Sequence, residues 1–320
     1  MEKFQVSSIL NNRYKIVSVY KIESGTIIYR TEDLRFPGET WLIHQLDISE
    51  NINSPSYLNN FFSLLSFLSK VIYEKIGKIV DYFTEKDCLI VVTEELPGVT
   101  LSEIIYTTTA NPIKTIKLAL QLLEIIKFLY SKNIINFCDI NPENIIVDKQ
   151  GMIKIISFGI SKLSTMVTDK GIEQNKFLGT LGYVPPEMID DDPANIKEHS
   201  YIYVISAIMY EYVTKISPYS REDPFFFPPI SSFASTFPNQ LNSFIEKCLS
   251  YNPANRIKTF KEFEKKLISI LKNESEIEEI SSKNPIFSLS KNQSLFFILV
   301  IILIQLFIIL AFFVYYIIIL

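Results

Sequence analysis

The sequence contains little glycine, histidine and cysteine for its length. Its 320 residues include 9 Gly, 2 His and 3 Cys. The cysteines, Cys88, Cys138 and Cys248, are far apart and form no Cys-x-x-Cys pair, which argues against a zinc site or a disulfide framework and fits a reducing compartment. The formal net charge is −4, which does not indicate a basic surface, so we expect no nucleic-acid partner.

The two ends of the sequence differ in hydrophobicity. The first ten residues contain no long apolar stretch, so we expect no secretory signal. At the other end, Gln305 is the only strongly polar residue within Leu295–Leu320. A bilayer core needs about 20 apolar helical residues. We therefore predict a single-pass transmembrane helix over residues 294–320, used as a tail anchor in a lipid bilayer.

The residues around this predicted helix indicate its orientation. Lys283 and Lys291 precede it and no charged residue follows it, so the positive-inside rule predicts a cytoplasmic location for the preceding domain. Gln305 would lie near the middle of the bilayer, where its amide can favour helix–helix self-association.

The rest of the chain divides into a β-rich part and a helical part, which predicts an α+β fold. Short β-rich runs are expected at Tyr14–Tyr20, Thr26–Arg30, Thr40–Gln45 and Cys88–Thr93, with one helix at Tyr57–Ser69. After Pro97-Gly98, helices are expected at Ile113–Tyr130, Tyr201–Thr214, Leu241–Leu249 and Phe260–Leu271, with one hairpin whose turn contains Gly151.

Three motifs flank this hairpin in a characteristic order. Asp139–Asn144 lies just before it, Ser157–Gly159 just after it, and Gly179–Glu187 further along the chain. They resemble the catalytic loop, the Asp-Phe-Gly motif and the Ala-Pro-Glu segment of Ser/Thr protein kinases. Leu10–Ile16 and Asn252–Ile257 are similar to the opening and the C-terminal lobe of the bacterial-type members.

The resemblance implies a bilobal protein-kinase-like fold. Its β-rich N-lobe would span residues 10–95 and its helical C-lobe residues 96–272, followed by a polar linker at 273–293 and the transmembrane helix. It also implies ATP and Mg as cofactors. The residues at the family's functional positions are Asp139, Asn141 and Thr180 for catalysis, Leu42, His44, Glu94 and Ile146 for the nucleotide, and Asn144 and Ser157 for the metal.

Several of these positions in the β-rich part depart from the family. His44 replaces the phosphate-binding lysine, and a neutral imidazole is shorter and mostly uncharged at pH 7. The bulk of Leu42 would crowd the adenine, and Phe61 stands where the helix glutamate belongs. Lys21, Glu23 and Thr26 take the glycine positions of the phosphate-covering loop, so we predict an ordinary β-hairpin there.

The catalytic and metal positions depart as well. Asn141 replaces a lysine, so a positive charge near the transferred group is expected to be lost. Ser157 replaces the metal-binding aspartate, and Mg²⁺ prefers anionic oxygen. Asp139 and Asn144 are retained, either for catalysis or to brace the loop through local backbone bonds. We therefore expect ATP binding to be weak or absent.

We interpret the chain as a pseudokinase, a membrane-held binding or scaffolding module with an unknown protein partner. The alternative is a weak or unconventional Ser/Thr kinase in which Lys21 or Arg30 supplies the missing charge. A third interpretation makes the membrane span the main functional element. Glu187 and Arg256 match a buried ion pair of the family, whereas Tyr201 replaces the aspartate that anchors the catalytic loop.

Overall fold

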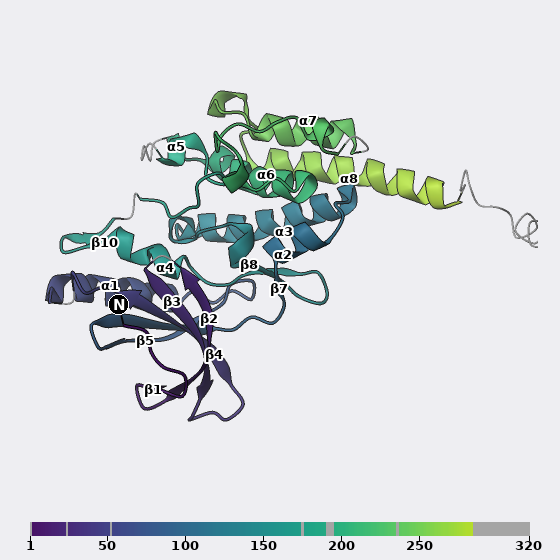
Figure 1. The fold of residues 1–320 in the computed structure, drawn as a ribbon. Helices are drawn as coiled ribbons and strands as arrows, with labels where there is room; N and C mark the ends of the chain where they lie inside the picture. The colour runs from purple at the N-terminus through teal and green to yellow at the C-terminus, as the bar shows by residue number, and fades with distance from the viewer. Residues whose placement is uncertain are drawn as a thin grey trace, which may run out of the picture. The chain divides into compact units, whose positions relative to one another are not determined.

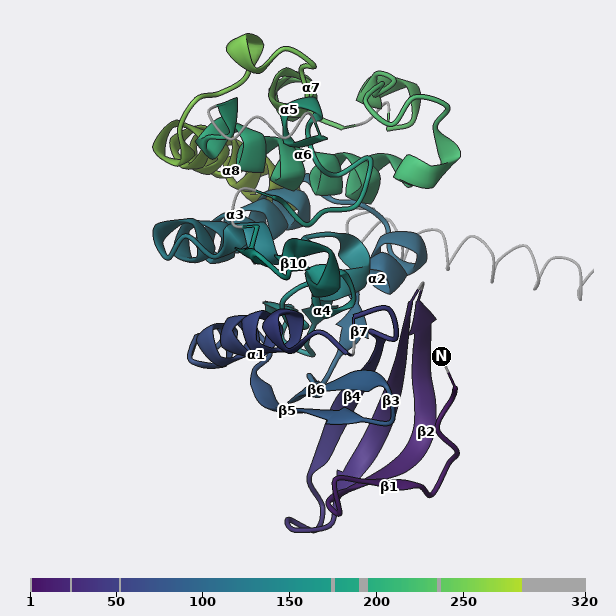
Figure 2. The same cartoon turned by 90° about the vertical axis from the view of Figure 1, so that its left-hand side faces the viewer.

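Figures 1 and 2 show the computed structural model of the chain. It describes residues 2–23, 25–51, 53–173, 176–189, 195–234 and 237–283, with side chains as far as residue 274. The chain divides into two units, Met1–Leu271 and Lys272–Leu320.

The N-terminal part of the first unit is a twisted antiparallel sheet, which lies at one end of this unit in Figure 2. Its strand order is β1-β2-β3-β4-β6-β5. The strands are β1 (Ile9–Leu10), β2 (Tyr14–Glu23), β3 (Thr26–Asp33), β4 (Thr40–Asp47), β5 (Ile79–Glu85) and β6 (Cys88–Glu94). All four predicted β-rich runs are strands of this sheet, and the sequence analysis missed β1 and β5.

Strand β6 is apolar on both faces because both faces of the sheet are covered there. Ile90 and Val92 pack in a small cluster on one face, whereas Leu89 and Val91 belong to the main core on the other. Helix α1 (Pro55–Ser69) covers the main-core face. It begins at Pro55 because the side chain of Ser54 caps it by accepting the amide N–H of Tyr57.

The helical lobe follows strand β6. Its helices are α2 (Leu101–Thr107), α3 (Pro112–Ser131), α4 (Ile160–Leu163), α5 (Pro186–Ile189), α6 (Glu198–Thr214), α7 (Asn239–Cys248) and α8 (Phe260–Lys283). Its strands are β7 (Val99–Thr100), β8 (Ile145–Val147) and β9 (Ile153–Ile155), which form one sheet, and β10 (Val167–Thr168) and β11 (Gly171–Ile172), which form another. Helix α6 is buried on nearly all sides and packs against α3 and α7.

The predicted hairpin is confirmed as β8 and β9. Gly151 has φ 78°, a left-handed conformation that favours glycine, and the carboxylate of Asp148 accepts amide N–H groups of Gln150 and Met152. The hairpin fixes the spacing between the two segments that flank it, the loop at Asp139–Asn144 and the segment at Ser157–Gly159.

Two predictions concern the C-terminal part of the chain. Helix α8 runs to Lys283 rather than ending at Leu271, so the first half of the expected polar linker is helical. Within the part of the chain that the structure describes, no helix is long and apolar enough to span a membrane. The predicted transmembrane helix at 294–320 lies outside the described residues.

Candidate functional site

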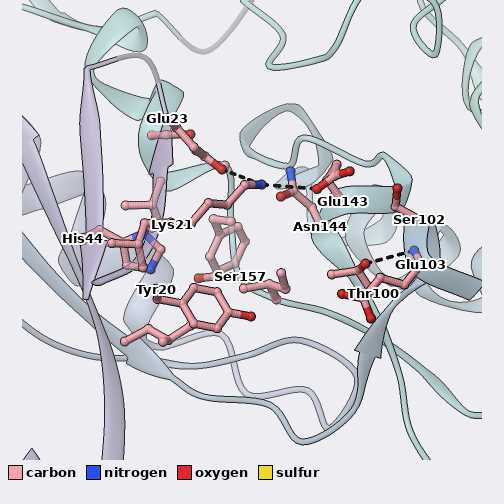
Figure 3. A pocket seen from close by; sticks show the side chains of 17 residues that line it. Tyr20, Lys21, Glu23, His44, Thr100, Ser102, Glu103, Glu143, Asn144 and Ser157 are labelled. Atoms are coloured by element: carbon pink, nitrogen blue, oxygen red, sulfur yellow. Dashed lines mark hydrogen bonds and ion pairs between the residues drawn. The ribbon is translucent and has the colours of Figure 1, made fainter. Parts of the chain in front are cut away.

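A cleft of about 450 Å³ opens between the sheet and the helical lobe (Figure 3). Strands β2, β3 and β4 line one side of it. The other side is formed by Thr100–Glu103, by Glu143 and Asn144, and by Ile156–Ser161. Its volume lies within the range of small-molecule sites.

The rear of the cleft contains Leu42 and His44, as the sequence analysis expected. The imidazole Nε2 of His44 lies 3.0 Å from Oγ1 of Thr93, whereas its Nδ1 has no partner in the described structure. Burial lowers the pKa of His44 to about 4, against a small opposing effect of Glu23. The imidazole is therefore uncharged at pH 7 and supplies no cation for a phosphate.

The two other positions assigned to nucleotide binding, Glu94 and Ile146, lie outside the cleft. The carboxylate of Glu94 accepts the amide N–H of Lys78 at 3.3 Å, and Ile146 pairs with Thr100 in the small sheet. Neither side chain lines the cleft. Phe61, at the helix glutamate position, is fully buried and stacks on Tyr57 inside the core, so helix α1 offers no carboxylate there.

Asp139, Asn141 and Thr180 come together, as their assignment to one catalytic site requires. The hydroxyl of Thr180 donates to a carboxylate oxygen of Asp139 at 2.9 Å. The side-chain amide of Asn141 donates to the Thr180 hydroxyl at 3.1 Å. The carboxylate of Asp139 is only 6% exposed, so hydrogen-bond and ionic partners must replace the water that a charged group loses on burial.

Lys162 supplies the positive charge that the sequence analysis expected to be lost. Its ammonium donates to Asp139 at 2.6 Å, and to the carbonyl of Gly179 and the hydroxyl of Thr180 at 3.0 Å each. The expectation was wrong because it followed the linear motif, in which Asn141 holds the lysine position. Lys162 reaches the same carboxylate from helix α4, and only the fold reveals this.

The catalytic loop is held by its own side chains. The amide oxygen of Asn141 accepts the backbone N–H groups of Glu143 and Asn144 at 2.9 and 3.2 Å. Asn144 donates in turn to the backbone carbonyl of Asp139 at 2.9 Å. These bonds support the interpretation that Asn144 braces the loop.

The metal position offers no anionic ligand. Ser157 is 5% exposed, and its hydroxyl lines the cleft without a hydrogen-bond partner in the described structure. Among the described residues, no group of three His, Cys, Asp or Glu side chains is placed to hold a metal ion. Since Mg²⁺ requires hard, usually anionic, oxygen ligands, this donor set does not fit the magnesium of the family.

An ion-pair network links the sheet side of the cleft to the catalytic loop. The ammonium of Lys21 lies 3.0 Å from Glu23 on its own strand and 3.4 Å from Glu143 of the catalytic loop (Figure 3). Burial opposes the charge of Lys21, but both carboxylates outweigh it and raise its pKa. Arg30, the other proposed source of charge, instead pairs with Glu95 at 2.7 Å.

The hairpin β2–β3 takes the place of the family's phosphate-covering loop. Strands β2 and β3 are paired along their whole length, from Tyr14 opposite Asp33 to Glu23 opposite Thr26, with two register shifts between these pairs. The residues at the family's glycine positions, Lys21, Glu23 and Thr26, are therefore strand residues. This confirms the expected β-hairpin.

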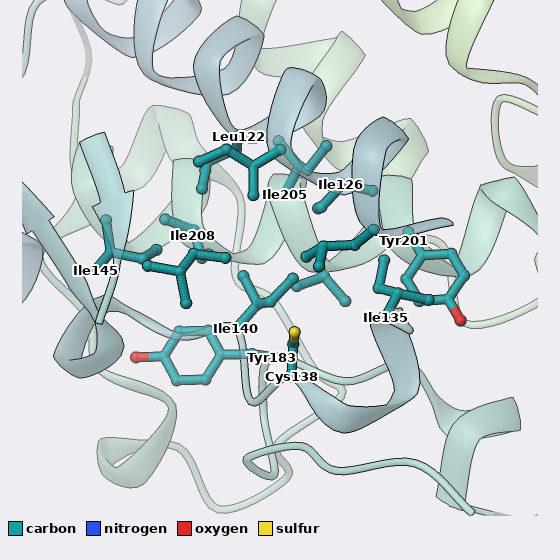
Figure 4. Close-up of a cluster of buried hydrophobic side chains, with 14 of the residues drawn as sticks. Leu122, Ile126, Ile135, Cys138, Ile140, Ile145, Tyr183, Tyr201, Ile205 and Ile208 are labelled. Carbon is teal, nitrogen blue, oxygen red and sulfur yellow. The ribbon is translucent and has the colours of Figure 1, made fainter. Parts of the chain in front are cut away.

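The helical lobe retains the buried ion pair that supports this site. Arg256 donates to both carboxylate oxygens of Glu187, at 2.6 and 3.0 Å, as predicted. Tyr201, which replaces the family's anchoring aspartate, is buried and packs edge-on against Tyr130. Figure 4 shows it beside Ile135, among apolar side chains that flank the catalytic loop, so apolar packing replaces a polar anchor.

The aromatic run Phe225–Phe227 is only partly buried. Phe227 packs edge-on against Tyr203 and Tyr210, as expected for a side chain inside the lobe. Phe226 is 61% exposed, and Phe225 contacts the exposed Tyr251.

Comparison with known protein families assigns residues 45–268 to the protein kinase domain. The chain belongs to the protein kinase family. The match starts directly after His44, so it leaves out the hairpin and the strand position at which this chain departs most from the family. Kinases of this family use ATP and magnesium.

The sequence relatives include bacterial Ser/Thr kinases, as predicted. A probable serine/threonine-protein kinase of Clostridium perfringens is 24% identical over 267 residues, which cover 80% of this chain and 38% of the relative. Serine/threonine-protein kinase PrkC of Bacillus subtilis is 25% identical over 270 residues, covering 80% and 40%. The chain thus spans about two fifths of the length of these relatives.

Solved structures share the bilobal fold. The kinase domain of Mycobacterium tuberculosis PknI has a TM-score of 0.61 at 14% identity, covering 83% of this chain and 99% of that one. Rad53 1–466, solved in complex with AMP-PNP, has a TM-score of 0.58 at 18% identity, covering 77% and 62%. At these identities the likeness concerns the fold alone.

Proposed function

We propose that this chain is a pseudokinase, a kinase-fold domain that acts by binding rather than by phosphoryl transfer. One observation carries the proposal: the side chains at two positions that are charged in the family are both neutral here. The residue at the phosphate-binding lysine position, His44, is buried and uncharged, with a pKa of about 4. The residue at the metal-binding aspartate position, Ser157, is neutral.

The charges around the cleft support this proposal. A magnesium–triphosphate complex needs cations around its phosphates and carboxylates around its metal. Here Lys21 lines the cleft, but Glu23 and Glu143 already hold it. Losing charge stabilisation of a transition state costs about 3 kcal/mol or more for each group removed, so losses at His44 and Ser157 reduce transfer by several orders of magnitude.

We further propose that the domain is held at the cytoplasmic face of a membrane by the apolar segment at 295–320. Its composition, with Gln305 as its one strongly polar residue, supports a spanning helix, and Gln305 is proposed to favour pairing of two such helices. The fold then serves as a scaffold for a protein partner, for which the exposed Phe226 is our candidate contact.

The second candidate function is a weak or unconventional Ser/Thr kinase. A specific observation favours it, because Lys162, Thr180 and Asp139 form a connected cluster at the position of the family's base. A substrate hydroxyl placed beside Asp139 would meet a carboxylate and an ammonium together.

Incorporation of labelled phosphate separates these two functions. The purified full chain is incubated with γ-labelled ATP and either Mg²⁺ or Mn²⁺, with generic protein substrates, and an active relative is assayed in parallel. We expect no incorporation above that of Asp139→Asn. Incorporation that Asp139→Asn abolishes would replace the pseudokinase proposal with the weak-kinase alternative.

A further inference from the structure

The cleft contains two buried polar atoms without partners. Nδ1 of His44 and Oγ of Ser157 have no hydrogen-bond partner in the described structure, and each residue is 5% exposed. Both residues line the cleft (Figure 3). Buried polar atoms are nearly always paired, so a ligand that enters the cleft with an N–H or O–H group would satisfy them.

Part of the cleft lining is apolar. Ile28 and Leu42 come from the sheet, and Ile156 and Phe158 from the segment after the hairpin. All four lie close to the two unpaired atoms in the same cleft of about 450 Å³. This lining suits a flat, apolar ring carrying one polar edge group.

The charge of the lining is negative. Glu23, Glu103 and Glu143 are the carboxylates that line the cleft, and Lys21 is the cation that lines it. Lys21 is shared between two of these carboxylates, so one negative charge is balanced and two remain. His44 adds nothing because it is uncharged. A cleft of this sign repels phosphates and attracts cations.

We propose that the cleft binds a small organic cation, with a flat apolar body, an N–H group at the buried end and an ammonium at the mouth. The N–H group faces His44 and Ser157, and the ammonium lies among Glu23, Glu103 and Glu143. This proposal rests on the proposed function, because it concerns the same cleft and requires that Mg-ATP does not occupy it.

Three probes with the same ring test the role of charge. Tryptamine is a cation, tryptophol is neutral and indole-3-acetate is an anion, and each carries the same indole N–H. The purified full chain is titrated with each by isothermal calorimetry in matched buffer. We expect tryptamine to bind about fivefold more tightly than tryptophol, and indole-3-acetate about fivefold more weakly, for a half-exposed site with excess negative charge.

Charge variants identify the groups responsible. Glu143→Gln and Glu103→Gln should each reduce the preference for tryptamine over tryptophol. Both side chains are exposed, so either variant can be used if the other fails to fold. Glu264→Gln is the matched control, since this carboxylate pairs with Lys127 away from the cleft. Raising salt from about 0.05 M to about 0.5 M also reduces the preference by screening exposed charge.

The outcomes separate this proposal from the proposed function. Equal affinities for the three probes, no binding of any of them, or a preference that survives in both cleft variants would overturn the cation proposal. A parallel titration with Mg-ATP addresses the proposed function itself. Tight Mg-ATP binding would refute the claim that the cleft has lost the family's nucleotide, on which both proposals rest. If Mg-ATP does not bind and the three indoles bind with equal affinity, the cation site alone is refuted.

Discussion

The family has a lysine at the position of Asn141. Replacing Lys162 with methionine tests whether Lys162 stabilises the catalytic loop in the role of that lysine. Methionine keeps most of the aliphatic volume and removes the ammonium. The carboxylate of Asp139, 6% exposed, then retains the hydroxyl of Thr180 but loses its ionic partner at 2.6 Å. The change therefore leaves a nearly buried charge without its counter-ion.

The size of the effect follows from the exposure of the two partners. Breaking a fully buried pair costs about 3–5 kcal/mol, and a hydrogen bond to a charged group contributes about 1.5–3 kcal/mol. Lys162 itself is 37% exposed, so water can take up part of the loss. We expect Lys162→Met to lower the free energy of unfolding by about 2 kcal/mol.

The assay is urea unfolding at neutral pH, followed by circular dichroism. With an m-value near 3 kcal/mol/M, a loss of about 2 kcal/mol moves the midpoint by about 0.7 M. Lys127→Met is the matched control, because Lys127 also lies 2.6 Å from its carboxylate and is 38% exposed, but its partner Glu264 is 42% exposed. An exposed pair of this kind contributes about 0–1 kcal/mol.

A second change distinguishes loss of charge from a packing defect. The side-chain amide of Asn141 lies 3.1 Å from the Thr180 hydroxyl, so a lysine at this position reaches the same cluster. Asn141→Lys also removes the two loop bonds that the Asn141 amide oxygen accepts, so the single and double variants are compared as a cycle. Asn141→Lys combined with Lys162→Met should lose less stability than the two single changes added together. Equal effects of Lys162→Met and Lys127→Met, or additive losses in the double variant, would refute the reasoning.

Three further predictions follow from the same structure. Glu187→Gln should lower the free energy of unfolding in urea by about 3–5 kcal/mol, because Arg256 is left buried without its counter-ion. Burial alone would raise the pKa of Glu187, but Arg256 outweighs burial and lowers this pKa. The stability from this pair is therefore present above about pH 4.5 and is lost as the pH falls further. Four changes restore the family side chains together: His44→Lys, Phe61→Glu, Asn141→Lys and Ser157→Asp. Calorimetry should show that this variant recovers Mg-ATP binding only in part, because Leu42 still narrows the cleft. Full recovery would show that charge alone blocks the nucleotide. Deleting residues 295–320 should release the chain from membranes in a flotation assay, and continued flotation would contradict the anchor.

Much of the fold could be predicted from local sequence patterns. Apolar periodicity located helix α1 to within two residues, and Gly151 located the turn of the hairpin β8–β9. Strand β5 was missed because its apolar residues do not alternate clearly and it lies at the sheet edge. The end of helix α8 was missed because charged residues continue the helix beyond its apolar face.

The site was predictable where residues are consecutive and unpredictable where the fold brings distant residues together. Asp139, Asn144 and Ser157 were found because they belong to linear motifs on each side of one hairpin. Lys162 was not found, because its role depends on the path of helix α4 back to the catalytic loop. The positions of Glu94 and Ile146 outside the cleft depend in the same way on the packing of the strands.

Titration with Mg-ATP tests the central claim most directly. Thermal unfolding of the full chain is followed with increasing ATP, with and without Mg²⁺ or Mn²⁺. We predict no gain in the free energy of unfolding, because His44 is uncharged and Ser157 provides no anionic metal ligand. A gain of about 4 kcal/mol at millimolar Mg-ATP would correspond to a micromolar Kd, and would contradict the claim that this cleft has lost the ligand of its family.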